Sequence, residues 1–386
     1  MTKNKLSFLI TGDFCPHRRI ENKFRKHKYN EVFNDFLKYS QNSDVVITNL
    51  ECPLTRSDKL LKKTGPNLKA HPECIKGIKF AGFNIVTLAN NHIMDYRKKG
   101  LDDTVRILKN NNIDYVGVGS NINEARKGLF KRIKDKTISI INICESEWSI
   151  AYKNKAGANP LDPINNYYQI KKAKNKSDFL ILIIHGGHEN FKYPSPRMIK
   201  TYRFFADSGA DIIIGHHSHM ASGFEIYNNV PIYYSLGNFI FDWQQRKSFW
   251  YKGYFVTFKL NNNDKIENLA IQPYNQCRIK PKLEIIKSNK DNYLKSIKKI
   301  SKEIKNPTNI ENKFKEFCKD RGTMYLASIS SLNKLQRIMI RNKFLRNLII
   351  RKKNIRRILN LVRCESHRDC LKNSLISFLL GEENKC

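Results

Sequence analysis

The sequence has few acidic residues for its size. It contains 35 Asp and Glu against 70 Lys and Arg, which gives a formal net charge of +35 over 386 residues. A field of this sign attracts polyanions such as nucleic acid, anionic lipid headgroups or an acidic polymer. The chain is also rich in Lys, Asn and Ile, and this compositional bias competes with a functional explanation of the charge. Net charge therefore selects no partner.

Long apolar runs and paired cysteine motifs are also missing. No stretch approaches the roughly 18 apolar residues of a membrane span. The apolar stretch from Phe8 to Ile10 is too short for the core of a signal peptide. The nine cysteines, an odd number without a CxxC pair, are dispersed as buried thiols would be. We therefore expect a cytoplasmic protein without a membrane anchor.

The apolar runs that are present are short, end in small or polar residues, and alternate with helix-patterned segments. This rhythm predicts a layered α/β domain. The expected strands cover residues 6–11, 44–49, 84–89, 137–143, 178–185, 210–216 and 231–237. Helical patterns lie between them at 29–40, 72–81, 100–110 and 196–208.

After about residue 280 the pattern changes to long, Lys-rich segments without strand runs. We predict a main domain over 1–280 and a basic, mainly helical C-terminal region over 281–386, with 281–320 as solvated helix and loop. From Leu332 onward apolar residues recur at helical spacing. Between Arg321 and Arg363 there is no Asp or Glu and there are twelve basic residues: Arg321, Lys334, Arg337, Arg341, Lys343, Arg346, Arg351, Lys352, Lys353, Arg356, Arg357 and Arg363.

The C-terminal pattern allows two interpretations. In the first, the apolar stripe packs on the main domain and leaves the basic face solvated. In the second, the helices bind an anionic surface, such as the inner face of the membrane or an acidic polymer.

Short polar motifs directly follow the apolar runs of the main domain. They are Gly12-Asp13, Asn-Leu-Glu at 49–51, Asn-Asn-His at 90–92, His185, and Gly-His-His-Ser-His at 215–219. The carboxyl ends of strands in α/β sheets form the ligand crevice, so motifs placed there can converge on one site. We expect them to form a single constellation.

The side chains in these motifs are those that bind divalent metals. We expect the ligands to be the carboxylates of Asp13 and Glu51, the amide oxygen of Asn91, and the imidazoles of His185, His217 and His219. Alternatively, His216 and not His217 is the ligand beside His219. If His217 is the ligand, we expect His216 to contact the ligands without binding the metal. His92 is better placed to act as an acid on a leaving group than as a ligand.

Several further residues have two interpretations. Asp95 could orient the His92 imidazole or start a helix at Lys98. Glu145 and Glu147 face the pocket or lie in a solvated loop. Glu189 is a candidate for substrate contact, and Asn238 for fixing a turn beside the site.

Longer blocks around these motifs resemble the CapA family of capsule-synthesis proteins. The blocks are GDF near the start, NLECPLT at 49–55, AGFNIVTLANNHIMDYRKKGLDDTVRIL at 81–108, HGGHEN at 185–190, and GADIIIGHHSHMASGFEIYNNVPIYYSLGNFIFD at 209–242. They occur in family order. The family is associated with synthesis of poly-γ-glutamate capsules and is similar to calcineurin-like metallophosphoesterases.

The resemblance implies a four-layer α/β/β/α sandwich around a centre of one or two divalent metals, such as Mn²⁺, Zn²⁺ or Fe. Two departures affect the site. Cys15 stands where the phosphoesterase pattern has a histidine, with His17 two residues further on, which predicts one weaker metal position. The family's usual DYG and HWG read Asp95-Tyr96-Arg97 and His185-Gly186-Gly187 here, which changes the pocket rim.

Two functions follow from the resemblance. The first is a metal-dependent hydrolase, acting on a phosphoester or amide in the synthesis or processing of an anionic cell-surface polymer. The second is a non-catalytic assembly protein that keeps the fold and binds the polymer. We expect the partner to be the anionic polymer or its precursor, and nucleic acid is not favoured because only net charge suggests it.

Overall fold

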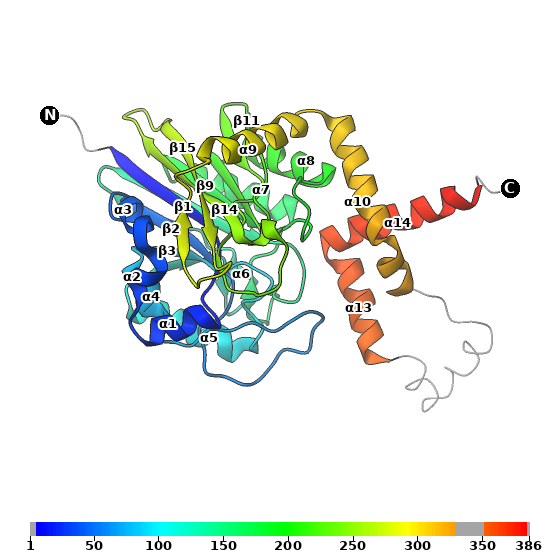
Figure 1. The fold of residues 1–386 in the computed structure, drawn as a ribbon, viewed down its shortest axis with the longest axis horizontal. Coiled ribbons are helices and arrows are strands. Elements are labelled where there is room, and N and C mark those ends of the chain that lie inside the picture. Colours follow the sequence, from blue (N-terminus) through cyan, green and yellow to red (C-terminus); the bar gives the residue numbers. More distant parts are fainter. Residues whose placement is uncertain (1–4, 329–350, 384–386) are drawn as a thin grey trace.

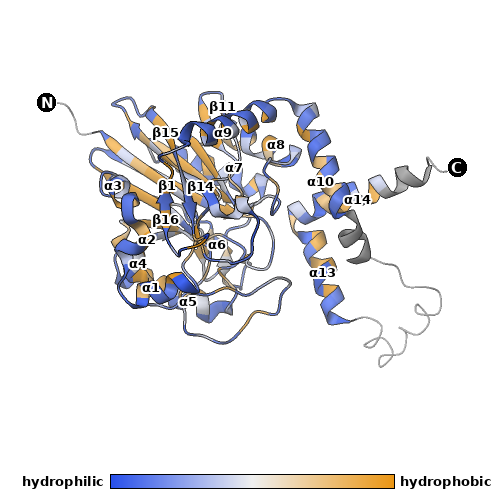
Figure 2. Ribbon diagram, in the orientation of Figure 1, coloured by the Kyte–Doolittle hydropathy of each residue, from blue (hydrophilic) through white to orange (hydrophobic). Residues whose placement is uncertain are grey.

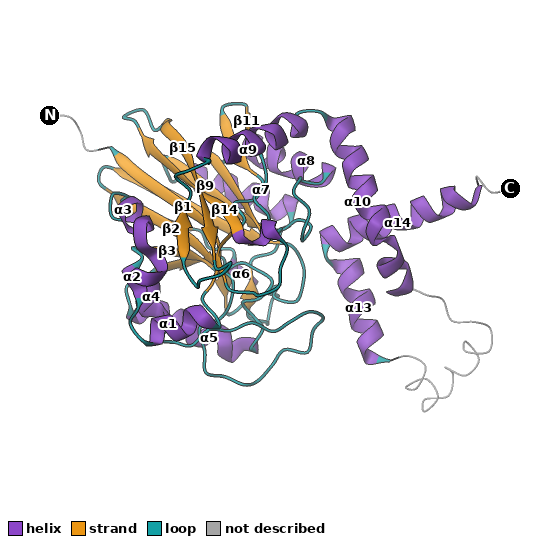
Figure 3. Ribbon diagram, viewed as in Figure 1, coloured by secondary structure: helices purple, strands orange, loops and turns teal. Residues whose placement is uncertain are grey.

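Two β-sheets form the centre of the computed structural model, which describes residues 5–328 and 351–383 (Figures 1 and 3). The first sheet has the order β16 (Leu283–Ile285), β15 (Ile266–Gln276), β14 (Lys252–Leu260), β1 (Leu6–Cys15), β2 (Val45–Leu50), β3 (Ile85–Thr87), β4 (Asp114–Val116), and β13 (Asn238–Phe241) pairs with β1. The second has the order β11 (Phe224–Tyr227), β12 (Val230–Tyr233), β10 (Ile212–His216), β9 (Phe179–His185), β7 (Lys136–Cys144), β6 (Leu129–Ile133). A small pair, β5 (Val118–Gly119) and β8 (Gly157–Ala158), stands apart.

Helices cover the outer face of each sheet. On the first sheet these are α1 (Arg19–Arg25), α2 (Tyr29–Phe33), α3 (Leu37–Ser40), α4 (Cys74–Phe80) and α5 (Arg97–Asn110). On the second they are α7 (Pro163–Lys174), α8 (Pro196–Asp207) and α9 (Lys290–Ile304). The short α6 (Ile122–Ala125) lies beside β5 and β8.

The strand β1 shows how the sequence produces these layers. Leu9 packs in the cluster formed with α1 to α5, whereas its neighbours Phe8 and Ile10 pack in the cluster that contains the second sheet. Successive side chains of a strand point to opposite faces, so a strand buried on both faces must be apolar throughout. The hydrophobic strands accordingly lie inside and the polar helix faces outside (Figure 2). The predicted four-layer α/β/β/α architecture is confirmed.

Each of the seven expected strands overlaps an observed one, but several boundaries differ. The expected strand at 231–237 ends at Tyr233, and the expected helix at 29–40 is divided between α2, a 3₁₀ turn at Asn34–Phe36, and α3. The long antiparallel strands β14 and β15 were not expected. Strand β16 continues the first sheet past the predicted boundary at residue 280.

The C-terminal region contains α9, α10 (Pro307–Ser328), α13 (Lys352–Arg363) and α14 (Glu365–Glu383). Helix α10 contacts α8, and α13 and α14 pack against α10 and against each other (Figure 1). The expectation that 281–320 is solvated is wrong, because α9 and α10 bury an apolar face: Ile297, Ile300, Ile304, Ile310, Phe314 and Cys318. No helix among the described residues is long and apolar enough to cross a membrane.

Only part of the predicted amphipathic tail can be placed. Lys334, Leu335, Arg337, Ile338, Met339, Arg341, Lys343, Leu345, Arg346, Leu348 and Ile349 lie outside the described residues. On α13, Ile355, Leu359 and Val362 are 48%, 48% and 55% exposed, while Leu361 is buried. These three residues of the stripe therefore do not pack on the main domain.

Candidate metal centre

The strand-end motifs of both sheets meet at one place. Asp13 lies near the end of β1, Glu51 follows β2, and Asn91 lies in the loop after β3. From the second sheet, His185 ends β9, and the motif that starts at His216 ends β10. The parallel strands of each sheet bring these ends to one edge, as expected for the ligand crevice of an α/β fold.

Two groups of side chains in this crevice could each hold a metal ion. One consists of Glu51, His185 and His217, and the other of Asp13, Glu51 and His219. The ligand atoms within each group lie within 4.8 Å of one another, and all five residues are buried. Glu51 belongs to both groups, so its carboxylate is shared between them.

In the first group the donor atoms converge on His185 Nε2. This nitrogen lies 3.1 Å from His217 Nδ1 and 3.6 Å from Glu51 Oε1. It also lies 3.1 Å from the amide oxygen of Asn91. The structure thus brings Asn91 to the ligand atoms of this group.

In the second group, His219 is oriented by Asn238. His219 Nδ1 lies 2.8 Å from Asn238 Oδ1, and the Asn238 amide also donates to the carbonyl of Trp250. This contact leaves His219 Nε2 directed toward Glu51 Oε1, 4.0 Å away. A partner that fixes the other ring nitrogen is the usual support of a metal-binding histidine.

The charges of the centre fit a cation. Both carboxylate oxygens of Glu51 are buried without a hydrogen-bond partner among the described residues, which is a costly arrangement for a carboxylate alone. Burial and the neighbouring Asp13 carboxylate raise the pKa of Glu51 well above its ordinary range. Burial and the neighbouring His217 hold the pKa of His185 well below its ordinary range. A divalent ion would satisfy the carboxylate and favour the neutral imidazole.

Asp13 is held by imidazoles from β9, from β10 and from the turn that follows β10. Burial alone would raise its pKa, but the imidazoles of His216, His185 and His219 hold it well below the ordinary range. His216 Nδ1 lies 3.2 Å from Asp13 Oδ1. His216 thus contacts the candidate ligand Asp13. The two ligand groups contain His217 and His219, and neither contains His216.

Asn49 was not among the predicted site residues. Its amide donates to Asp13 Oδ1 over 2.8 Å and lies 3.1 Å from His185 Nδ1, so it positions one side chain from each sheet. The motif Asn49-Leu50-Glu51 drew attention to this position, but the carboxylate of Glu51 was the stronger signal.

The backbone around the ligands is unusual. His217 and His219 have backbone φ angles of 92° and 57°, in a region that residues other than glycine rarely adopt. Within β1, a Cβ on Gly12 would lie 1.9 Å from the carbonyl oxygen of Gly237. The chain therefore needs glycine at residue 12 for β13 to approach β1 next to Asp13.

His92 belongs to a separate buried trio at the edge of the centre. Its Nδ1 lies 2.6 Å from Asp95 Oδ2 and 3.2 Å from Lys63 Nζ, and Lys63 also pairs with Asp95. Asp95 does not cap a helix, because α5 begins after Tyr96 without a side-chain cap. The structure therefore supports the interpretation that Asp95 orients His92. Lys63, which is 3% exposed, gave no signal in the sequence.

The acidic residues after β7 do not form a solvated loop, as we had considered. Glu147 Oε1 lies 3.4 Å from the Asn91 amide and 3.7 Å from His217 Nε2, so Glu147 faces the centre. Glu145 is buried and pairs with Arg197 on α8, 2.7 Å away. Glu189 is exposed and lines the adjoining cavity.

Neither Cys15 nor His17 replaces the histidine ligand of the phosphoesterase pattern. His17 is buried, with Nδ1 2.8 Å from Cys15 Sγ and Nε2 2.9 Å from the carbonyl of Asp242. Burial and the nearby Arg18 lower the pKa of His17 to about 4. Neither Cys15 nor His17 belongs to a metal-ligand group among the described residues.

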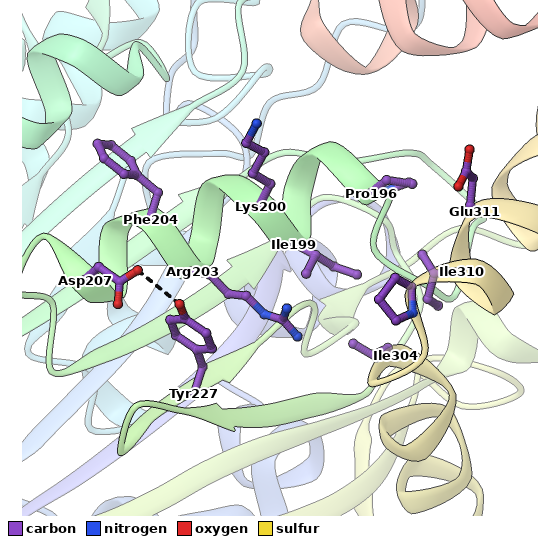
Figure 4. A pocket seen from close by; sticks show the side chains of 11 residues that line it. Pro196, Ile199, Lys200, Arg203, Phe204, Asp207, Tyr227, Ile304, Ile310 and Glu311 are labelled. Carbon is purple, nitrogen blue, oxygen red and sulfur yellow. Dashed lines mark hydrogen bonds between the residues drawn. The ribbon is translucent and has the colours of Figure 1, made fainter.

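A cavity of about 560 Å³ adjoins the centre. The main domain contributes Thr64, Gly65, Glu147, Gly187, His188, Glu189 and His217, and the C-terminal helices contribute Phe317, Arg321, Arg357, Asn360, Leu361, Cys364, Ser366, His367 and Cys370. The C-terminal region is thus one wall of the candidate site. A different cavity of about 460 Å³, between α8 and the junction of α9 and α10, contains none of the candidate ligands (Figure 4).

The chain is similar to several known proteins. The family described as "Bacterial capsule synthesis protein PGA_cap" matches residues 7–243. The capsule biosynthesis protein CapA of Bacillus anthracis is 34% identical over 254 residues, which cover 63% of this chain and 62% of the relative. The PGA biosynthesis protein CapA of Bacillus subtilis is 32% identical over 246 residues, which cover 61% of this chain and 63% of the relative.

Among solved structures, one described as a novel phosphatase from Mycoplasma pneumoniae is 18% identical, with a TM-score of 0.47, and the match covers 76% of this chain and 97% of that one. The chain spans less than two thirds of the length of the two Bacillus relatives. The family match contains every candidate ligand from Asp13 to His219. The chain belongs to the family of bacterial capsule synthesis proteins of the PGA_cap type.

Proposed function

We propose that this chain is a metal-dependent hydrolase that cleaves a phosphoester or amide during the synthesis or processing of an anionic capsule or cell-surface polymer, such as poly-γ-glutamate. The observation that supports this most directly is the pair of ligand groups sharing Glu51. Adjacent metal positions joined by one carboxylate are typical of hydrolytic centres that hold two ions.

The proposed ligands are Asp13, Glu51, Asn91, His185, His217 and His219, for one or two ions. The mixture of carboxylates, an amide oxygen and imidazoles suits Mn²⁺, Zn²⁺ or Fe. When bound, such an ion lowers the pKa of water and polarises the oxygen of the substrate. Cys15 in place of the usual histidine makes the position beside Asp13 the weaker of the two.

We further propose that His92 donates a proton to the leaving group. Asp95 and Lys63 both contact Nδ1 of the imidazole, so Nε2 is the nitrogen available to the substrate. The contact with Asp95 fixes the orientation of the ring. Asp95 is thus a positioning residue for His92.

The substrate would enter through the cavity that adjoins His217. Arg321 and Arg357 line its C-terminal wall, and their positive charge favours an anionic polymer or its precursor. Names of the relatives point in the same direction, since both Bacillus proteins are described by capsule or PGA biosynthesis.

A non-catalytic assembly protein is the alternative, and the cysteine at residue 15 favours it because one metal position lacks its usual ligand. Elemental analysis of purified protein, followed by hydrolysis assays on a chromogenic phosphodiester and on γ-glutamyl amides, tests the two. Bound metal and turnover that Asp13→Asn abolishes would support the hydrolase. Inert protein that binds the polymer would support the assembly role.

A further inference from the structure

The turn between α13 and α14 carries a buried thiol beside the candidate centre. Cys364 is 1% exposed and ends α13, and His367 lies one helical turn later in α14. Glu147 approaches this pair from the loop after β7. The ligand atoms of Glu147, Cys364 and His367 all lie within 4.8 Å of one another.

The surroundings of Cys364 are strongly acidic. A second group brings Cys364 within 4.8 Å of Glu145 and Glu365. These two carboxylates have other partners, because Glu145 pairs with Arg197, and Glu365 accepts hydrogen bonds from the backbone and hydroxyl of Ser146 at 2.8 and 3.1 Å. Glu147 and His367 line the cavity together with Cys364, whose thiol also lies 3.9 Å from Glu145 Oε2.

This acidic environment opposes ionisation of the thiol in the absence of a cation. Burial and the nearby Glu147, Glu145 and Glu365 raise the pKa of Cys364 well above its ordinary value. The guanidinium of Arg363 is engaged over the ring of Trp148, 3.9 Å from its centroid. A divalent cation at this place would compensate the carboxylates and bind the deprotonated thiol.

The cavity also contains polar atoms that need a partner. Asn360 Oδ1 and His188 Nδ1 have no hydrogen-bond partner among the described residues, and each residue is 6% exposed. Both residues line the same cavity as Cys364. Unpaired polar atoms at these positions indicate that the cavity holds a polar guest.

We propose that Glu147, Cys364 and His367 form a further metal site, separate from the centre built on Glu51, for a thiophilic divalent cation such as Zn²⁺. Three protein ligands of these types suit a tetrahedral ion and leave its fourth position to the cavity. The ion fixes the turn between α13 and α14 to the loop that carries Glu147. Since Glu147 also contacts Asn91 and His217, the C-terminal helices are tied to the main centre. The site does not depend on hydrolase activity.

Titration of the purified full-length protein with Co²⁺ tests this site. A thiolate bound to Co²⁺ gives a charge-transfer band in the near ultraviolet, and neither group of the main centre contains a cysteine. We expect the band in the unmodified protein, in Glu51→Gln, and in the control Cys15→Ser, which removes the cysteine nearest Asp13 in the sequence. Cys364→Ser should lose the band and one equivalent of bound metal.

Absence of the band at metal saturation, or its persistence in Cys364→Ser, would overturn the proposal. Circular dichroism establishes whether Cys364→Ser is folded. His367→Ala, at a half-buried position, keeps the thiol and provides a second measurement. Its Co²⁺ affinity, followed through the same band, should fall by about tenfold or more. An unchanged affinity would equally reject the site.

Discussion

Glu51 is the residue whose environment is hardest to explain without a cation. It is fully buried, and no described residue donates a hydrogen bond to either carboxylate oxygen. Glu225 is also buried but is paired with Arg203 and with the hydroxyl of Tyr234. The fold thus supplies a cation for Glu225 but none for Glu51 among the described residues, so a bound ion would stabilise the Glu51 carboxylate.

Replacing Glu51 by Gln should therefore weaken metal binding at both positions. The substitution keeps the shape of the side chain but removes the negative charge shared by the two ligand groups. We expect at least about a tenfold loss of affinity, measured by elemental analysis after dialysis. Glu225→Gln is the matched control, which should reduce stability but keep the metal. Equal metal content in Glu51→Gln and the unmodified protein would exclude Glu51 as a ligand.

His92→Ala should separate proton transfer from metal binding. Loss of a general acid slows turnover by about 100-fold or more, while the metal content should remain because His92 belongs to neither ligand group. Asp95→Asn should produce a smaller loss of the same kind, with a changed pH profile. If His92→Ala loses metal in proportion to activity, His92 is a ligand and the proposed role is wrong.

At the scale of elements, the approach of β13 to β1 brings Asn238 beside Asp13. The register pairs Asp13 with Asn238, and the pairing shifts at the next residue. An irregularity of this kind redirects side chains near a site. Gly12 makes this approach possible, because any larger residue would meet the carbonyl of Gly237.

Gly12→Ala should destabilise the protein by about 3 kcal/mol, since the added methyl group can only be accommodated by moving β13. Thermal unfolding measures this loss. Gly128→Ala is a suitable control, because its Cβ would meet nothing closer than 3.4 Å. Similar melting temperatures for the two variants would show that β13 moves without cost.

A second junction between elements joins α14 to the main domain. Arg197 on α8 donates to Glu145 and to the hydroxyl of Ser366, and it also pairs with Asp369 on α14. The main domain and the C-terminal region therefore share one ionic cluster. Glu145 depends on it, since the pKa of this buried carboxyl is lowered to about 2 once Arg197 and Ser366 offset the effect of burial.

Arg197→Ala should leave Glu145 buried without its cation, at a cost of about 3 kcal/mol. Hydrogen exchange should show faster opening of α14 than of the central strands. Arg106→Ala removes an exposed contact with Asp103 on α5 and should cost less than about 1 kcal/mol. Unchanged protection of α14 in Arg197→Ala would mean that apolar packing alone holds the helix.

At the scale of the molecule, α13 presents exposed apolar side chains together with basic ones. Ile355, Leu359 and Val362 are exposed on the same helix as Lys352 and Lys353. A helix of this type can lie in a lipid interface, where each basic residue contributes about 1 kcal/mol near an anionic surface. We propose that α13 contacts the inner face of an anionic membrane, or an acidic polymer.

The double variant Lys352→Gln and Lys353→Gln should weaken binding to anionic vesicles by about 30-fold and leave binding to neutral vesicles unaffected. Co-sedimentation measures both. Lys298→Gln with Lys299→Gln, on the exposed face of α9, changes the net charge equally and serves as control. If both double variants bind alike, only net charge matters and α13 has no specific role.

The central strands and most of the candidate ligands can be read from the order of residues along the chain. Residues such as Phe8, Leu9 and Ile10 must form a strand buried on both faces, because they are apolar without interruption. The polar residue types that follow such runs can then be assigned to one edge of the fold. Asp13, Glu51 and the histidines are found in this way from local pattern alone.

The part played by the remaining residues depends on contacts between distant segments of the folded chain. Lys63 lies in a segment without apolar pattern, and the direction of Glu147 depends on contacts with Asn91 and His217. The turn at Cys364 reaches the loop after β7 across more than 200 residues of chain, through Ser146 and Glu365. Local periodicity carries no information about such a contact, because it depends on how α10, α13 and α14 pack on one another and how α10 and α14 meet α8.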